Sequence, residues 1–274
     1  MTKIISKAIN KGLSILEYYF SINWFNPFAT LYVNFRSLPF KKAVCLPIWM
    51  YGRPRLMSLF GKIDIKAPLK SGMIRFNYVN IGSPSNMGVQ SEINNKGTIV
   101  FHGSAKIRTG NRIVVGFGAS LEIGDKLIMG DNINIGCMES IKIGSNTRIA
   151  HRSQIFDSNY HYVANLSKKI VNPLSKPIVI GKGCWICNSS TVNSGAVIPD
   201  YCILASNGVI NKDWAGCEHG TMFAGAPAKP IAAGVRLVNN INKEHEITSY
   251  HKTHNNSPYL ITKDIDEKEW FEQQ

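Results

Sequence analysis

An apolar side chain returns at every sixth position through much of the second half of the chain. From residue 180 these aliphatic positions are Ile180, Ile186, Val192, Ile198, Leu204 and Ile210. A small residue lies four positions after each of the first five, namely Cys184, Ser190, Ala196, Cys202 and Gly208. An α-helix repeats about every 3.6 residues and a two-sided strand every second residue, so a period of six indicates neither element.

Two earlier runs keep the same period, at Phe117, Ile123, Met129 and Ile135 and then at Ile143, Ile149 and Ile155. We interpret each six-residue unit as a short strand with a tight corner, whose aliphatic side chain points inward. Three units close one triangular coil, and coils must stack because one coil cannot bury its own faces. About ten to twelve such units between residues 100 and 210 predict a mainly β protein, a parallel β-helix.

One segment interrupts the period. Ile155 and Ile180 are 25 residues apart, which is four units plus one residue, so the chain can leave the coil and return near phase. We therefore predict a protruding loop at about 157–177. A loop on a rigid scaffold is a common place for a functional site. Polar side chains alternate at its start: Asp157, Asn159 and His161.

The two ends of the chain lack the repeat, and three regions are expected. Residues 1–60 form a basic helical and aromatic segment, residues 61–233 the β-helix, and residues 234–274 a polar tail with a short helix. Residues 1–20 have the pattern of a basic amphipathic helix. That helix either packs on its own domain or lies on an anionic membrane face.

Charge is concentrated at the same end. The formal net charge is +13, and residues 1–70 contribute +9 of it, with eleven Lys or Arg against two acids. Such a basic region favours an anionic partner, of which a membrane surface is one. No nucleic-acid motif accompanies it, so a nucleic-acid partner is not expected.

The apolar runs and the cysteines of the sequence indicate the cellular compartment. The longest apolar run, at 43–50, is too short to span a bilayer, and no cleavable signal peptide is recognised. Six cysteines show no disulfide framework, so we expect a cytoplasmic protein, with peripheral contact at the inner membrane face as a further option. Cys184 and Cys187 form a CxxC outside a strand–helix context, which we interpret as two small residues of the repeat.

Three stretches together resemble a known family. They read "IGSNTRIAHRSQIFDSNYH", "KPIVIGKGCWICNSSTVNSGAVIPDYCILASNGVINKDW" and "FAGAPAKPI". Over about residues 95–233 the chain resembles the left-handed β-helix (hexapeptide-repeat) acyltransferases, in particular bacterial sugar and polysaccharide O-acetyltransferases related to the maltose, galactoside and xenobiotic acetyltransferases. The resemblance implies a left-handed coil, acetyl-CoA as co-substrate, and a homotrimer with active sites between subunits.

The resemblance also implies roles for the loop residues. His161 matches the catalytic His of the family's D-x-D/N-x-H pattern, and imidazole suits a general base near neutral pH. Asp157 either orients that ring, binds acceptor hydroxyls or caps the turn. Asn159 stands where many relatives carry Asp, and we assign it to acceptor binding.

Coenzyme residues are carried over in the same way. Trp185 is expected to form a wall for the pantetheine or the acceptor. Backbone groups near Ser206, Asn207 and Gly225 are expected to meet the pantetheine amides, and Lys229 a CoA phosphate. No metal is expected: γ-class carbonic anhydrases bind zinc on this fold through an H-x4-H pair, which residues 83–215 lack.

The main functional hypothesis is an acetyl-CoA-dependent O-acetyltransferase that modifies a carbohydrate hydroxyl in surface polysaccharide or glycan biosynthesis. An N-acetyltransferase acting on an amino-sugar is the enzymatic alternative. A non-catalytic β-helix that binds membrane or glycan is the alternative from a different class. The sequence does not identify the acceptor.

Overall fold

The computed structural model describes residues 10–14, 24–79, 89–255, 257–262 and 264–272. Three parallel sheets form the sides of a triangular prism, the left-handed β-helix expected from the six-residue period. The first sheet contains β1 (Ile48–Met50), β4 (Ile74–Tyr78), β7 (Ala105–Arg108), β10 (Leu127–Met129), β13 (Arg148–Ile149), β18 (Trp185–Ile186), β21 (Ile203–Leu204), β23 (Met222–Gly225) and β24 (Ala228–Ala232), with β24 antiparallel to β23.

The other two sheets follow the same order of coils. The second contains β2 (Arg55–Leu59), β5 (Glu92–Asn95), β8 (Arg112–Val115), β11 (Asn134–Cys137), β14 (Gln154–Phe156), β19 (Thr191–Asn193) and β22 (Val209–Ile210). The third contains β3 (Lys62–Ile65), β6 (Thr98–Phe101), β9 (Ser120–Ile123), β12 (Ser140–Ile143), β17 (Ile178–Ile180) and β20 (Val197–Ile198). We name the corners of the prism the first–second, second–third and third–first edges.

Side chains of one kind stack inside the prism in register. In the second sheet one buried ladder runs through Ile93, Ile113, Ile135, Ile155, Val192 and Ile210. Each fully buried aliphatic side chain contributes about 1.5–3 kcal/mol relative to an exposed one, so the ladders are a main source of stability. The small residues that follow the aliphatic positions are buried at the corners, as Cys184, Ala196 and Cys202 show.

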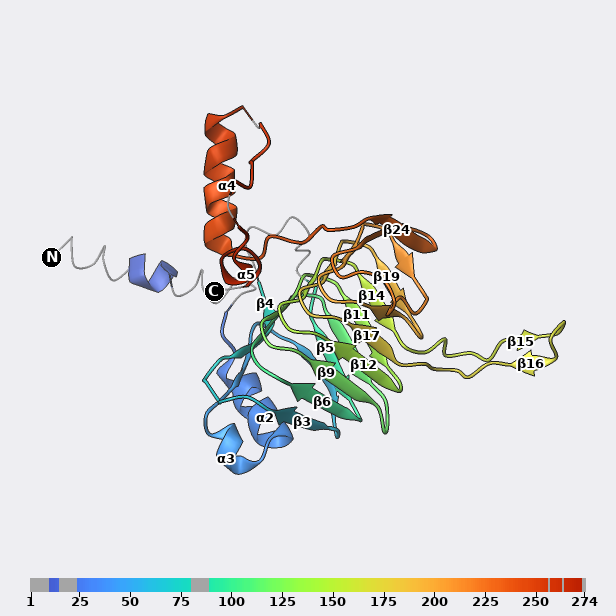
Figure 1. Ribbon diagram of the computed structural model, residues 1–274. Helices are drawn as coiled ribbons and strands as arrows, with labels where there is room; N and C mark the ends of the chain where they lie inside the picture. The colour runs from blue at the N-terminus through green and yellow to red at the C-terminus, as the bar shows by residue number, and fades with distance from the viewer. Residues whose placement is uncertain (1–9, 15–23, 80–88, 256, 263, 273–274) are drawn as a thin grey trace.

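The first coil begins at Ile48, inside the segment 1–60 that the sequence separated from the β-helix. Two helices, α2 (Pro27–Ser37) and α3 (Phe40–Ala43), lie at this end of the prism (Figure 1). Asn26 caps α2 by accepting the Ala29 amide at 2.9 Å. The amphipathic helix expected over 1–20 falls largely outside the described residues; of it, residues 10–14 are helical and exposed.

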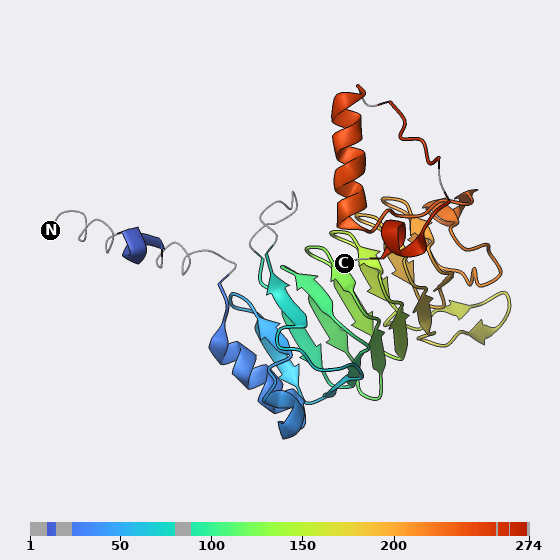
Figure 2. The same cartoon turned by 60° about the vertical axis from the view of Figure 1, so that its left-hand side comes forward.

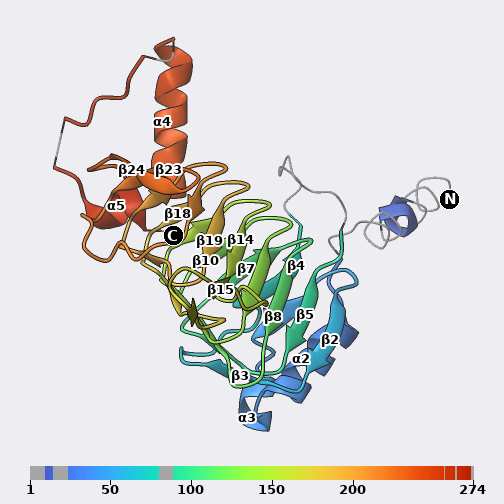
Figure 3. The same cartoon turned by 90° about the vertical axis from the view of Figure 1, so that its right-hand side faces the viewer.

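The loop and the tail project from different parts of the prism. Between β14 and β17 the chain forms a long arm (Figure 1), in which β15 (Ala164–Asn165) pairs with the antiparallel β16 (Ile170–Val171). The arm points toward the viewer in Figure 3, and the loop expected at about 157–177 is confirmed. The tail forms α4 (Ile241–Thr253), which stands away from the coils in Figure 2, and α5 (Glu267–Phe271).

Candidate functional site

Asp157 fastens the root of the loop at the second–third edge. Its side chain is fully buried, Oδ1 accepts the amide of Met138 at 2.7 Å, and Oδ2 accepts the amide of Glu139 at 2.8 Å. Its carbonyl accepts the Lys176 amide at 2.9 Å, which ties the outgoing strand of the loop to the returning one. Two charge-assisted bonds from one carboxylate therefore attach the loop to the preceding coil.

Tyr160 is a positioning residue that the sequence did not reveal. Its backbone lies in the left-handed region with φ of 58°, which is unusual for a bulky side chain. Its ring meets that of Phe156 edge to face with centroids 6.2 Å apart, and its hydroxyl lies over Gly136, where an added Cβ would overlap the Tyr160 hydroxyl and the Phe156 ring. Burial, and then the Asp157 carboxylate, raise the pKa of Tyr160. The one feature of the sequence that could have indicated this contact is Gly136, a glycine inside a strand.

Asn159 and His161 lie on either side of Tyr160 and are exposed. The Asn159 amide donates to the Leu174 carbonyl at 3.0 Å, so the side chain leaves an ordered two-stranded stem. Among the residues that the structure describes, the His161 imidazole has no hydrogen-bond or ion-pair partner. The three polar loop residues thus lie together at one edge: Asp157 faces inward, whereas Asn159 and His161 face outward.

The coenzyme candidates of the last coils lie at the first–second edge. Ser206 Oγ donates to Asn188 Oδ1 at 2.7 Å, and the Asn207 amide donates to the Asn188 carbonyl at 3.1 Å. Both residues are exposed, and Asn207 turns the corner with φ of 59°. Trp185, half-buried in β18, is in register with Ile203 of β21 on the same sheet.

Gly225 and Lys229 belong to the hairpin that ends the β-helix. Lys229 is exposed on β24, opposite Ala224 of β23, and Gly225 has φ of 95°, a conformation that favours glycine. Because β18, β21, β23 and β24 are successive neighbours in the first sheet, the five coenzyme candidates form one group.

Within one chain, this group and the loop occupy different edges of the prism. The loop leaves between the second and third sheets, whereas the Ser206–Asn207 corner joins the first sheet to the second. Trp185 belongs to the first sheet and is therefore not on the edge that carries His161. A single chain does not place both groups on one edge.

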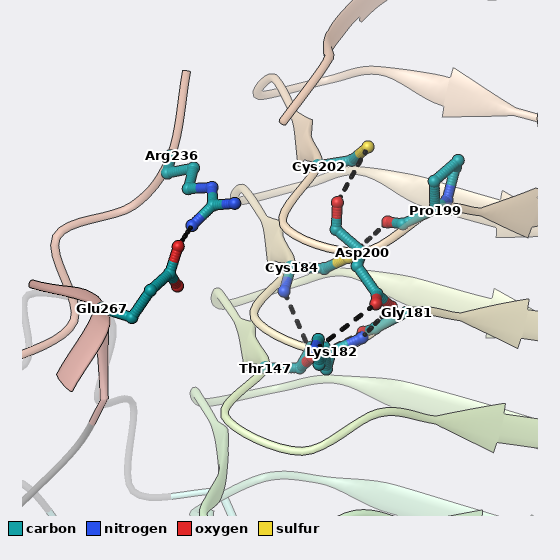
Figure 4. A network of polar contacts seen from close by, with 9 residues as sticks. All are labelled: Thr147, Gly181, Lys182, Cys184, Pro199, Asp200, Cys202, Arg236 and Glu267. Carbon is teal, nitrogen blue, oxygen red and sulfur yellow. Dashed lines mark hydrogen bonds and ion pairs between the residues drawn. The ribbon is translucent and has the colours of Figure 1, made fainter. Parts of the chain in front are cut away.

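Both CxxC cysteines are buried, and Figure 4 shows the surroundings of Cys184. Cys184 Sγ donates to the Pro199 carbonyl at 3.1 Å, and burial raises the pKa of its thiol. Burial also raises the pKa of Cys187 to about 11, and the two residues lie at opposite ends of β18. Such thiols remain protonated and unreactive at neutral pH. Across the described residues no group of three His, Cys, Asp or Glu side chains is arranged to hold a metal ion.

Solved structures of acyltransferases are similar to this chain. NeuO, a polySia-specific acetyltransferase, is 17% identical, with 71% of this chain and 84% of that chain covered at a TM-score of 0.52. The polysialic acid O-acetyltransferase OatWY is 19% identical over 67% and 86% at 0.37. A mutant of AntD, an N-acyltransferase from Bacillus cereus, in complex with dTDP and coenzyme A, is 12% identical over 76% and 89% at 0.42.

The match to NeuO shows that the two chains share a fold, and the left-handed β-helix expected from the resemblance is confirmed. No protein-family model matches the chain. Within the described ranges, no helix is long and apolar enough to cross a membrane.

Proposed function

We propose that the chain is an acetyl-CoA-dependent O-acetyltransferase that acts on a carbohydrate hydroxyl in the biosynthesis of a surface polysaccharide or another glycan. One observation carries the proposal: a loop leaves the β-helix, is anchored by the buried Asp157, and exposes His161 four residues later. NeuO, which has the same fold, is a polySia-specific acetyltransferase, and this supports a carbohydrate acceptor.

The proposed chemistry is a direct transfer. The imidazole of His161 accepts the proton of the acceptor hydroxyl as the oxygen attacks the thioester carbonyl of acetyl-CoA. The new C–O bond forms, the C–S bond breaks, and the leaving CoA thiolate takes the proton from the imidazolium. A backbone N–H stabilises the oxyanion between these steps. Asp157 holds the loop in position, and the Asn159 amide binds hydroxyls of the acceptor.

The charge of the loop favours a hydroxyl over an amine acceptor. Between residues 157 and 177 the loop carries three lysines and one acid. That acid is Asp157, and both of its carboxylate oxygens accept backbone amides. An ammonium group is usually held by a carboxylate, since a buried or bound charge must be paired. A neutral hydroxyl needs no such partner.

The coenzyme would lie along the first–second edge of a neighbouring subunit. Trp185 would form a wall of the cleft, groups near Ser206, Asn207 and Gly225 would meet the pantetheine amides, and Lys229 would meet a phosphate. The separation of this edge from the edge that carries the loop supports a homotrimer, because cyclic assembly brings different surfaces of neighbouring subunits together.

The decisive experiment incubates the protein with acetyl-CoA and a panel of neutral sugars, amino-sugars, nucleotide sugars and glycans, and follows the release of free CoA thiol. We expect turnover with a neutral hydroxyl acceptor. His161→Ala should lower turnover by a factor of about 10²–10⁴, the usual contribution of a general base. It should leave CoA binding and assembly intact.

The matched control is His102→Ala, because His102 is paired with Glu122 at 3.1 Å on the third sheet and lies off the loop. Near wild-type turnover of His161→Ala would refute the assignment of the base. Turnover restricted to amino-sugars would support N-acetyl transfer instead. A melting temperature that does not rise with added CoA would indicate a non-catalytic β-helix, because a bound ligand stabilises the folded state by mass action.

A further inference from the structure

Helix α2 buries three polar residues beside the apolar Val33 and exposes large apolar side chains. Two of the polar residues bond to β1: Thr30 Oγ1 accepts the Met50 amide at 3.0 Å, and Asn34 exchanges hydrogen bonds with the backbone of Ile48 at 3.2 and 2.7 Å. These bonds cap the edge strand β1, whose backbone groups would otherwise be unpaired. The exposed side of α2 is apolar at helical spacing: Phe28, Leu31, Tyr32 and Phe35.

The apolar surface continues beyond α2. The rings of Phe35 and Phe40 are 5.8 Å apart, and the Arg36 guanidinium lies 5.8 Å from the centre of the Phe60 ring. Phe28, Phe40 and Phe60 are 82%, 73% and 79% exposed. Together with the less exposed Val44 and Met57, at 52% and 56%, these residues form a surface that we call the N-terminal aromatic face. A continuous apolar surface of this kind marks an interaction site, whereas single exposed apolar residues do not.

Positive charge surrounds this face. Residues 24–70 contain eight Lys or Arg and one acid, Asp64. Lys42 binds Asp64 at 2.9 Å, so that carboxylate is neutralised, whereas Lys41 and Lys62 are exposed. On the flank of the first coils, a pocket of about 340 Å³ is lined by Lys70 and by three further cationic side chains, Arg75, Lys106 and Lys126.

We propose that the N-terminal aromatic face docks on an anionic lipid bilayer. Aromatic side chains partition into the boundary between headgroups and acyl chains, and Lys or Arg around them meet lipid phosphates. A second copy of this face would oppose cations with cations, which disfavours a symmetric contact. Residues 1–23, which precede α2 in the sequence, carry three lysines and one glutamate.

Docking on a membrane also restricts the class of acceptor that the enzyme can reach, and this inference rests on the proposed function. In a cyclic trimer with prisms side by side, three N-terminal aromatic faces point the same way, and three weak contacts combine by avidity. Enzyme held at a bilayer in this way meets acceptors at that surface, so a lipid-linked glycan is the acceptor class we infer.

The test is flotation of the full chain with phosphatidylcholine vesicles and with vesicles that contain equal parts of phosphatidylcholine and phosphatidylglycerol. We expect binding to the anionic vesicles only. Phe28→Ser combined with Phe60→Ser should lower the bound fraction about tenfold or more, and Lys41→Gln and Lys62→Gln about fivefold each. The matched control is Phe117→Ser, since Phe117 is 78% exposed beside Lys96 but lies on the body of the prism.

A label on the exposed Cys45, next to Val44, gives an independent readout in a Cys217→Ser background. An environment-sensitive fluorophore there should report an apolar medium on mixing with anionic vesicles. Equal binding to both vesicles, no binding, or equal losses in Phe117→Ser and the aromatic variants would overturn the proposal. A change of oligomeric state in the aromatic variants would indicate instead that the N-terminal aromatic face is an interface between copies of this chain. None of these readouts involves acetyl-CoA, so they are independent of the proposed activity.

Discussion

Single residues divide the loop into an anchored root and an exposed tip. Asp157 is fully buried and accepts two backbone amides, Tyr160 packs over Gly136, and His161 lies beyond them in solvent. The five residues of the D-x-N-x-H pattern therefore differ in their structural roles. Its first member stabilises the loop, and its last member is available for chemistry.

Asp157→Asn tests this division. An amide cannot accept from both N–H groups as a carboxylate does, so the amide of Met138 or Glu139 loses its acceptor, which costs about 1–3 kcal/mol. Chemical denaturation should show that loss, together with reduced turnover. Asn159→Ala, at an exposed position, should change the free energy of unfolding by less than about 0.5 kcal/mol. Unchanged stability in Asp157→Asn would contradict the anchoring role.

Thiol reactivity provides a second prediction at this scale. Cys45 is exposed, whereas burial raises the pKa of Cys137 to about 12 and that of Cys187 to about 11. A thiol reagent added to the native protein at neutral pH should therefore modify Cys45 first and leave the buried thiols until unfolding. Mass spectrometry of partially labelled protein would identify the sites. Early modification of Cys184 or Cys187 would contradict this prediction and support a redox or metal-binding role for the CxxC.

At the scale of elements, strand β11 controls where the loop points. Its Gly136 lies under Tyr160, and its neighbour Cys137 is buried at the same corner. The strand therefore belongs to the repeat and supports the candidate site as well. Elements outside the six-residue repeat are harder to predict, and α4 is an example. Lys243 is the buried residue of this helix, so α4 has no buried apolar stripe that the sequence could have revealed.

Gly136→Ala should displace the loop while the coils remain intact. The added Cβ would overlap the Tyr160 hydroxyl and the Phe156 ring, both of which belong to the loop root. We expect turnover to fall about tenfold or more, because small misplacement of a catalytic group is costly. CoA should bind as before. Gly118→Ala is the comparison, since a Cβ there meets open space, although its φ of 74° makes some loss of stability expected.

At the scale of the whole molecule, the two groups of candidate site residues lie on different parts of one prism. The loop projects from the second–third edge, whereas Ser206 and Asn207 lie at the first–second edge near the C-terminal end. The other coenzyme candidates lie on the adjoining first sheet. The opposite end carries α2, α3 and the N-terminal aromatic face. Assembly into a trimer would complete the active site and leave that end free for a membrane.

Mixed trimers test whether the site is shared. His161→Ala lacks the base, and Asn207→Trp is designed to block the coenzyme edge; each alone should be inactive. When the two are refolded together in equal amounts, about a quarter of the interfaces combine an intact loop with an intact coenzyme edge in a cyclic trimer. Turnover should recover to about that fraction of wild type. No recovery, with mixed trimers demonstrated by mass, would place the whole site within one chain.

The sequence by itself determined the architecture and the loop. Each six-residue unit packs against copies of itself, so a local period is enough to predict the coil, and a break in the period is enough to predict the excursion at 157–177. It did not reveal that coil strands begin at Ile48, because the first coils are irregular, with a bulge between Leu56 and Ser58.

Only the tertiary structure decided which groups lie on which edge. Asp157 meets amides 18 and 19 positions earlier in the chain because consecutive coils stack, and α2 turns the polar Thr30 and Asn34 inward because β1 offers unpaired backbone groups there. Both outcomes depend on surfaces that exist only after the coils have closed. The sequence pattern shows which side chains are apolar, whereas the stacking of the coils determines which groups each polar side chain contacts.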